Sequence, residues 1–328
     1  MILKDKLESG AVIVLDGATG TEIARLGGAM HSAAWYAAAN KTHPNTVRLV
    51  HEEYLRAGAD VITANTFATC RHVLAGAGLA DETVAINKRA VELARQARDN
   101  VAPARPVAVA GSMSNTVAWK EGTLSPDPRY LPTREQEAAN QREMADALAE
   151  AGADLLILEM MMDVERAALC LEAALATGLP VWVGISCSVA ADGAVTGWDI
   201  VKEERGKLSE DHPAGAPLPL TEIIDALQSM GGEAYGIMHS SIEATPKGLD
   251  VLFSRWNGPV MAYPETLRMD VNTHQPTQTA SPEAFAEVCR SYVENGVQII
   301  GGCCGTTIEH IRAMVDALPD HVGPRPAA

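Results

Sequence analysis

The chain has 328 residues, of which 47% are hydrophobic and 21% charged, so it can bury the core of one large domain or two small ones. Its 42 acidic residues outnumber its 26 basic residues, and the formal net charge of −16 argues against nucleic acid or a membrane surface as a partner. The sequence also shows neither a transmembrane apolar run nor a signal peptide, so we expect a cytoplasmic protein that acts on small molecules. The oligomeric state is left open, a homo-oligomer included.

Short and nearly continuous apolar runs recur along the chain, which is typical of strands covered on both faces. In chain order they predict eight strands, at residues 12–16, 61–67, 106–113, 154–160, 181–187, 234–241, 259–265 and 297–304. Helical patterns that begin at capping residues and often end at glycine lie between them, at residues 44–58, 81–100, 133–152, 163–178, 220–231, 245–257, 281–296 and 307–318.

Eight strand–helix units predict an α/β fold, a single (β/α)₈ barrel of the TIM type that takes up residues 1–328 as one domain. An open, doubly wound sheet is the alternative, but Gly17 and Gly20 after the first strand do not fit the phosphate-binding spacing of that fold. Two long connections, residues 114–132 and 189–219, follow the third and fifth strands. They would lie on the face where barrels build active sites, as lids or as plain surface loops.

Polar and metal-binding side chains stand where the predicted strands end. They are Asp16, Asn65, Thr66, Glu159, Cys187, His239, Cys303 and Cys304. Because the strands of a parallel barrel all end at one face, we expect these side chains to surround a single mouth.

The segment GGCCGTT at 301–307 carries the strongest local signal. A tight cysteine pair in a reducing compartment is more often metal-binding or catalytic than part of a disulfide scaffold. Neighbouring side chains of a regular strand point to opposite faces, so Cys303 and Cys304 can share an ion only where the flanking glycines let the backbone leave the strand. Two buried small side chains and a strained vicinal disulfide are the alternatives.

A catalytic zinc ion usually has three protein ligands and one open position, so the cysteine pair needs a third partner. Cys187 and His239 both stand at strand ends, and both residue types bind zinc. The residues alone do not decide between them.

The chain resembles the homocysteine S-methyltransferase family, which includes betaine-dependent and S-methylmethionine-dependent enzymes. The likeness spans nearly the whole chain and rests on segments in the family's order: DGATGTE at 16–22, HEEYLRAGADVITANTF at 51–67, GSMSNT at 111–116, LLILEMMMDVERA at 155–167, YP at 263–264 and GGCCGTTIEHI at 301–311. The last segment is specific, and the others add weight through their order.

The resemblance implies a (β/α)₈ barrel with zinc held by three cysteines, two of which match Cys303 and Cys304. The third cysteine of the family lies in a G-V/I-N-C segment, where this chain reads GIMH at 236–239. We therefore expect a Cys₂His zinc site with His239 as the third ligand. Cys187 as a substitute ligand, and loss of the metal, are the alternatives.

The resemblance also implies that Asp16 and Glu159 hold the amino acid part of homocysteine, and acidic residues suit its ammonium group. Thr19, Asn65 and Thr66 are expected to line the same substrate site. The structural alternative for the two acidic residues is a helix cap and a buried, hydrogen-bonded carboxylate.

Aromatic side chains on the two long connections suggest where a positively charged methyl donor would bind, because aromatic faces attract cations. Trp119, Tyr130 and Trp198 form the predicted donor cage, with ordinary packing as the alternative role for each.

Together these features predict a zinc-dependent thiol methyltransferase that moves a methyl group from a sulfonium or quaternary ammonium donor to homocysteine, giving methionine. One alternative is a metal-dependent hydrolase or lyase on the same barrel, although paired cysteines suit thiol binding better than hydrolysis. The other is a relative with an altered methyl acceptor or a lost metal site.

Overall fold

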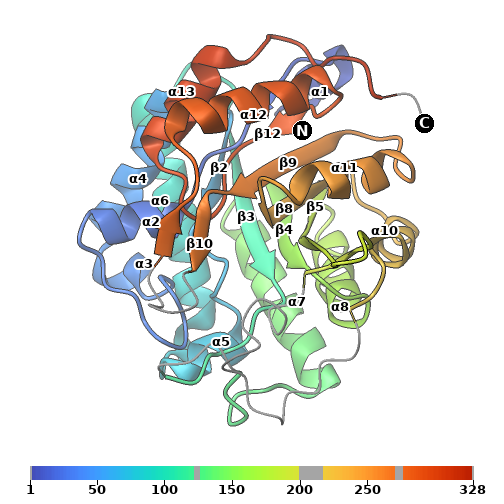
Figure 1. Ribbon diagram of the computed structural model, residues 1–328. Helices are drawn as coiled ribbons and strands as arrows, with labels where there is room; N and C mark the ends of the chain where they lie inside the picture. The colour runs from blue at the N-terminus through green and yellow to red at the C-terminus, as the bar shows by residue number, and fades with distance from the viewer. Residues whose placement is uncertain (1, 122–125, 199–216, 270–275, 327–328) are drawn as a thin grey trace.

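The computed structural model describes residues 2–121, 126–198, 217–269 and 276–326. Eight parallel strands form one sheet in the order β1-β12-β9-β8-β5-β4-β3-β2 (Figure 1). The strands are β1 (Ile13–Val14), β2 (Val61–Ala64), β3 (Ala108–Ser114), β4 (Leu155–Met161), β5 (Val181–Ile185), β8 (Ala234–Ser241), β9 (Val260–Glu265) and β12 (Ile299–Ile300). A parallel bridge between Leu15 and Val61 joins the two ends of the sheet, which confirms the predicted barrel.

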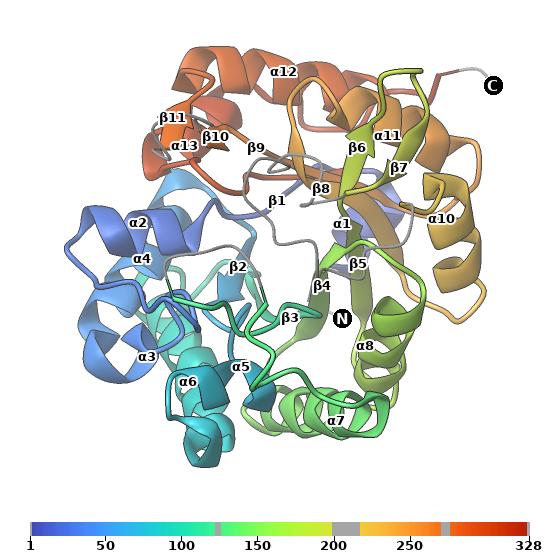
Figure 2. The ribbon, with the colours of Figure 1, turned by 60° about the horizontal axis from the view of Figure 1, so that its bottom comes forward.

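Helices surround the strands on the outside, as Figure 2 shows in a view toward the end of the barrel that lies at the bottom of Figure 1. The helices that follow the strands are α4 (Pro44–Ala57), α6 (Thr83–Val101), α7 (Arg134–Glu150), α8 (Glu165–Leu175), α10 (Leu220–Gln228), α11 (Thr245–Phe253), α12 (Pro282–Glu294) and α13 (Ile308–Ala317). Each lies within a predicted helical segment, apart from a one-residue extension of α6. Among the described residues, no helix combines the length and the apolar character needed to cross a membrane.

Several elements outside the eight strand–helix units were not predicted. The additional helices are α1 (Lys4–Ser9), α2 (Thr19–Arg25), α3 (Ala39–Thr42), α5 (Arg71–Gly76) and the 3₁₀ turn η1 (Ala80–Glu82). Two antiparallel hairpins follow β5 and β9, namely β6 (Cys187–Val189) with β7 (Val195–Gly197) and β10 (Leu267–Met269) with β11 (Pro276–Gln278). Residues 122–125 and 199–216 of the two long connections lie outside the described residues.

Four of the strands end before the apolar runs that predicted them. The first ends at Val14, the second at Ala64, the fifth at Ile185 and the last at Ile300. Beyond these ends single hydrogen bonds to neighbouring strands persist, such as those from Asp16 N to Val61 O and from Cys303 N to Pro264 O, but the regular ladder stops. The residues of the predicted runs that lie beyond these strand ends include several that form the mouth of the barrel.

The side chains inside the barrel follow the strict alternation of a strand. In β4, Leu155 and Ile157 belong to the interior cluster, whereas Leu156 and Leu158 pack outward against the helices. The same alternation continues to Glu159, which therefore points into the barrel. Trp182 fills the interior from β5 and is fully buried.

Two aspartates form hydrogen bonds across the seam, the place where the edge strands β1 and β2 meet and close the barrel. At the amino end, Asp60 accepts a hydrogen bond from Val14 N at 3.0 Å, and its own backbone N donates to Val14 O at 2.8 Å. The same carboxylate also contacts Lys6 Nζ at 2.7 Å, which ties α1 to the barrel. At the carboxyl end, Asp16 N donates to Val61 O at 3.0 Å.

We expect Asp60→Ala to lower the free energy of unfolding by about 1–3 kcal/mol, because the buried Val14 N–H loses its acceptor. Urea unfolding measures the change. Glu8→Ala is the matched control, since that carboxylate makes only an exposed contact with Lys4. Equal unfolding midpoints for Asp60→Ala and the parent chain would contradict this role for the seam.

Candidate functional site

An irregular residue at the end of β8 brings a histidine into the barrel. Met238 faces the interior and Ile237 faces the helices, so a regular strand would turn His239 outward. Instead, the register with β9 shifts between Met238 and Ser241, and His239 adopts a left-handed backbone with φ 42°. Bulges of this kind re-aim a side chain, and a non-glycine residue held there is typical of functional sites.

The cysteine pair lies on the loop that follows β12, where the backbone is fixed from both sides. Cys303 N donates to Pro264 O at 3.0 Å, and Cys304 O accepts from Thr266 N at 2.9 Å. Glycine is required at two places here. Gly305 has φ 82°, and a Cβ on Gly302 would lie 2.4 Å from the hydroxyl of Thr306.

These two segments bring three ligand atoms together. His239 Nδ1 lies 3.6 Å from Cys303 Sγ and 3.5 Å from Cys304 Sγ, and the two sulfurs are 4.0 Å apart. Tetrahedral zinc with bonds of about 2.3 Å to sulfur and about 2.0 Å to nitrogen places two sulfurs about 3.8 Å apart, and sulfur and nitrogen about 3.5 Å apart. The three side chains therefore fit one tetrahedral metal ion with a fourth position left for another ligand.

The two thiols also differ electrostatically. The pKa of Cys304 is held well below its usual value, because Cys303 donates a hydrogen bond toward its sulfur and His239 lies beside it. The hydrogen bond and burial raise the pKa of Cys303. A site that favours a thiolate at one sulfur suits a cation, since thiolate is the form that binds metal.

Cys187, the substitute third ligand, does not lie at this cluster. Its sulfur packs outward against α11, 3.9 Å from Ala244 O, and a Cβ on Gly248 of that helix would meet it at 2.7 Å. Burial raises the pKa of Cys187 to about 11. The alternation of β5 explains the difference, because Trp182 faces the interior and Cys187 falls on the opposite face.

Asp16 lies beneath the mouth, between the first two strands. Its carboxylate accepts hydrogen bonds from Thr63 N at 2.7 Å and Thr63 Oγ1 at 2.9 Å, and its carbonyl accepts one from Gly302 N at 3.1 Å. Burial is the main cause that raises the pKa of Asp16 to about 8, and the negative charge of Glu159 adds to it. Asp16 thus holds the seam and also connects it to the cysteine loop.

Glu159 reaches the same space from β4 and accepts a short hydrogen bond from the hydroxyl of Ser112 on β3. Burial raises its pKa to about 7, and the hydrogen bond from Ser112 partly opposes the shift. The next residue, Met160, has φ 58°, and its N–H donates to the sulfur of Met238 at 3.1 Å. The irregular ends of β4 and β8 are therefore joined directly.

The remaining predicted substrate residues have other contacts. Asn65 donates its amide to Tyr36 O at 2.9 Å and to Asn40 Oδ1 at 3.1 Å. Thr66 is fully buried and donates its hydroxyl to Ser112 O at 2.7 Å. Thr19 begins α2 and is half-buried. Their part in substrate binding stays a prediction.

One of the three predicted cage residues lies at the metal cluster. The ring of Trp198 meets His239 edge-on, with ring centroids 5.1 Å apart and an interplanar angle of 83°. Its backbone N donates to Ser186 O at 2.8 Å, which fixes the end of the β6–β7 hairpin. On the other loop, Trp119 bridges to Pro126, and the ring of Tyr130 stacks with Arg129 at 5.2 Å.

Sequence reasoning missed two polar residues of the site. Ser112 holds Glu159, and Glu265 at the end of β9 brings its carboxylate to 3.4 Å from His239 Nδ1. Glu265 follows an apolar strand in the same way as Glu159 does, so the strand-end signal was present in the sequence.

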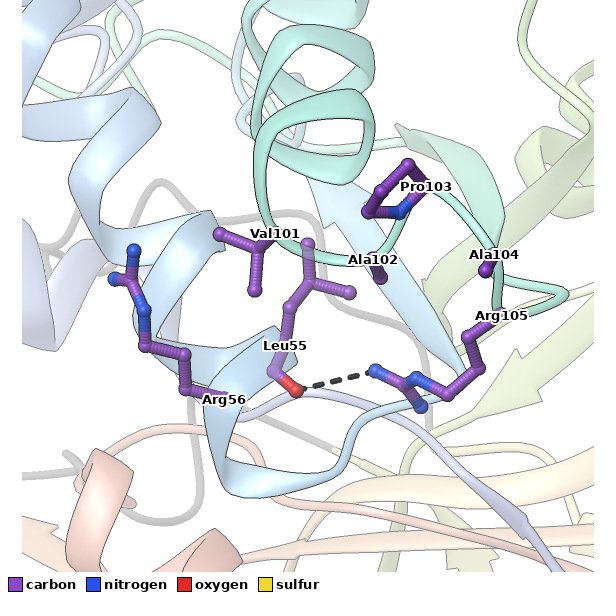
Figure 3. A pocket seen from close by; sticks show the side chains of 7 residues that line it. All are labelled: Leu55, Arg56, Val101, Ala102, Pro103, Ala104 and Arg105. Carbon is purple, nitrogen blue, oxygen red and sulfur yellow. Dashed lines mark hydrogen bonds between the residues drawn. The ribbon is translucent and has the colours of Figure 1, made fainter.

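A surface hollow of about 540 Å³ lies at the opposite end of the barrel, where α4 and α6 lead into β2 and β3 (Figure 3). It is lined by residues 55–56 and 101–105. The guanidinium of Arg105 donates to Leu55 O at 3.1 Å and lies 3.5 Å from Asp60, so it serves the architecture. The candidate site lies at the other face.

Comparison with known proteins agrees with the fold and identifies a family. A family model described as homocysteine S-methyltransferase matches residues 13–318. Homocysteine S-methyltransferase 2 of Arabidopsis thaliana is 26% identical over 341 residues, 95% of each chain. A selenocysteine methyltransferase of Astragalus bisulcatus is 26% identical and covers 97% of this chain and 95% of its own.

A solved structure has the same fold. The metallated form of an Escherichia coli homocysteine methyltransferase superimposes with a TM-score of 0.72 at 24% identity, and the match covers 96% of this chain and 99% of the other.

Asp16→Asn tests the buried carboxylate through the pH dependence of stability. Because the folded-state pKa of Asp16 is raised to about 8, the folded protein keeps a proton that the unfolded chain releases near pH 4. The parent therefore loses stability from this group between about pH 4 and pH 8.

The amide introduced at this position carries no charge, so we expect the Asp16→Asn variant to gain stability relative to the parent as the pH rises from 5 to 8. Urea unfolding of both chains at the two pH values measures the gain, and shared contributions from other groups cancel in the difference. A difference that is the same at both pH values would contradict the raised pKa.

Proposed function

The chain belongs to the homocysteine S-methyltransferase family, and we propose that it methylates the thiol of homocysteine with zinc held by His239, Cys303 and Cys304. The methyl donor would be a sulfonium or quaternary ammonium compound, and the product methionine. The observation that carries the proposal is the spacing of the three ligand atoms, which matches tetrahedral zinc and lies beside two buried carboxylates.

Zinc, when bound, would lower the pKa of a thiol that joins it, so that the acceptor sulfur is a thiolate at neutral pH. His239, Cys303 and Cys304 would hold the ion and leave its fourth position open for that sulfur. The positions of these residues are fixed by the bulge at His239 and by two backbone hydrogen bonds, one that Cys303 N donates to Pro264 O and one that Cys304 O accepts from Thr266 N.

Asp16 and Glu159 would bind the ammonium group of homocysteine. Burial raises the pKa of both carboxyl groups toward or above neutrality, so each needs a nearby positive charge to be stable as a carboxylate. An ammonium ion between them supplies that charge. Thr63 and Ser112 would keep the two carboxyl groups oriented through the hydrogen bonds they already donate. Thr19, Asn65 and Thr66 remain candidates for the rest of the amino acid.

The donor would approach from the side of Trp198, whose ring lies against His239. In the transfer, the thiolate sulfur forms a bond to the methyl carbon while the bond from that carbon to the onium atom breaks, and the onium centre of the donor leaves uncharged. Both charges disappear, so a site with little water favours the step. Trp119 and Tyr130 remain predicted members of the donor cage, although Trp119 bridges to Pro126 and Tyr130 stacks with Arg129. A reducing cytoplasm would keep both cysteines as thiols.

Metal analysis tests the zinc site. We expect about one zinc per chain in the purified protein, and loss of zinc in Cys303→Ser and His239→Ala, because three protein ligands are the usual minimum for such a site. Cys187→Ala is the matched control and should keep its zinc, since this sulfur faces α11. A parent chain that binds no zinc, or that keeps it after both ligand substitutions, would refute the site.

A donor panel tests the reaction. Homocysteine is combined with S-methylmethionine, glycine betaine or dimethylsulfoniopropionate, and methionine formation is measured; selenocysteine is included as a second acceptor. We expect methionine with at least one onium donor and none with Cys303→Ser. Zinc-loaded protein that gives no product with any donor would count against the proposed donor class.

Trp198→Ala tests the donor wall. A cation over an aromatic ring contributes about 0.5–2 kcal/mol, so the KM for the donor should rise about 2- to 30-fold, while the KM for homocysteine should change little. Trp198→Phe keeps an aromatic face and should lose less. Unchanged donor kinetics in Trp198→Ala would dismiss this residue from the cage.

A further inference from the structure

A fourth functional side chain stands at the metal cluster. The Oε2 atom of Glu265 lies 3.4 Å from His239 Nδ1, the same nitrogen that faces the two sulfurs. Both side chains are largely buried, with 16% of Glu265 and 15% of His239 exposed. The carboxylate therefore lies next to the ligand nitrogen, beside the cluster of His239, Cys303 and Cys304 and outside its set of ligand atoms.

The backbone holds Glu265 in this place. Its neighbours on either side are bonded to the cysteine pair, since Pro264 O accepts from Cys303 N and Thr266 N donates to Cys304 O. Glu265 also pairs in register with Ser241, just beyond the bulge that turns His239 inward. The backbone of Glu265 is therefore held next to both ligand-bearing segments by main-chain pairing.

The charges of the cluster give this carboxylate a role. Two thiolates cancel the charge of a divalent ion, and a neutral imidazole adds nothing, so the three ligands alone leave a formally neutral centre. We propose that Glu265 is the charge partner of the metal centre, and that its carboxylate supplies the negative charge that the imidazole ligand lacks. In a partly buried site this charge acts through a lower dielectric than water, which strengthens its attraction for the ion.

This inference rests on the metal site of the proposed function but not on the identity of the donor or the acceptor. It predicts that positions 239 and 265 are energetically coupled. When the ligand at 239 is a neutral imidazole, tight zinc binding requires the negative charge of Glu265. A thiolate at 239 would supply that negative charge itself. A residue that only packed beside the cluster would show no such dependence.

A double-mutant cycle measures the coupling, with zinc alone as the probe and competition against a chelator as the readout. The variants are Glu265→Gln, His239→Cys and the combination of both. Glu265→Gln alone should weaken zinc binding about tenfold or more, as removal of a partner beside a metal ligand commonly does. In the His239→Cys background the same substitution should be neutral or should strengthen binding.

Two further variants keep the result interpretable. Glu265→Asp retains the charge on a shorter side chain and should lose less affinity than Glu265→Gln. Glu287→Gln removes an exposed acidic residue of α12 and should leave zinc binding unchanged. Circular dichroism of the variants shows that each has folded.

The inference is overturned if Glu265→Gln changes zinc affinity by the same factor in both backgrounds, within about twofold, or has no effect in the parent. In that case, a parent chain that binds zinc and a Cys303→Ser variant that does not would show that the proposed metal site is correct and that only the role of Glu265 is refuted. A parent that binds no zinc would refute both the inference and the proposed site.

Discussion

The left-handed backbone of His239 is the constraint on which the site depends. Strand alternation alone would send this imidazole toward the helices, and the cysteine pair would have no third ligand inside the barrel. The irregular end of β4, with Met160 also at positive φ, is bonded to the sulfur of Met238 and so supports the residue before the bulge. The His239 side chain is therefore positioned by the irregular end of β8, which the irregular end of β4 supports.

The two buried carboxyl groups, those of Asp16 and Glu159, add a second constraint, because the fold must accommodate them while no substrate is bound. Asp16 is held by Thr63, and Glu159 by Ser112, and each hydrogen bond partly offsets the desolvation that raises the pKa of the carboxyl group. These bonds also hold neighbouring strands together. Under the proposed function, the same carboxyl groups would bind substrate and hold strands together at the carboxyl end of the barrel, whereas Asp60 holds strands together at the amino end.

The fold was predictable from sequence because strands covered on both faces appear as continuous apolar runs, and eight such runs alternate with helical patterns. Because both faces of these strands are apolar, the sequence does not show toward which face each side chain points. With both faces apolar, nothing in residues 181–187 revealed that Trp182 faces inward and Cys187 outward, so the sequence left Cys187 and His239 as equal candidates until the family resemblance favoured His239. A positive φ is most common at glycine and asparagine, so a histidine at position 239 did not indicate the bulge. Glu265 was not predicted as a site residue, although it stands at the carboxyl end of an apolar run, as Glu159 does.

The strand order has a consequence for the synthesis of the protein. The first strand pairs with the last, Ile13 with Ile299, and Ala18 N donates to the hydroxyl of Thr306 across a separation of 288 residues. The cysteine pair follows the last strand of the sheet, so all eight strands have been made before His239, Cys303 and Cys304 can meet. Such distant pairings fold slowly. If the chain binds zinc as proposed, the three-ligand site forms only once the barrel has closed.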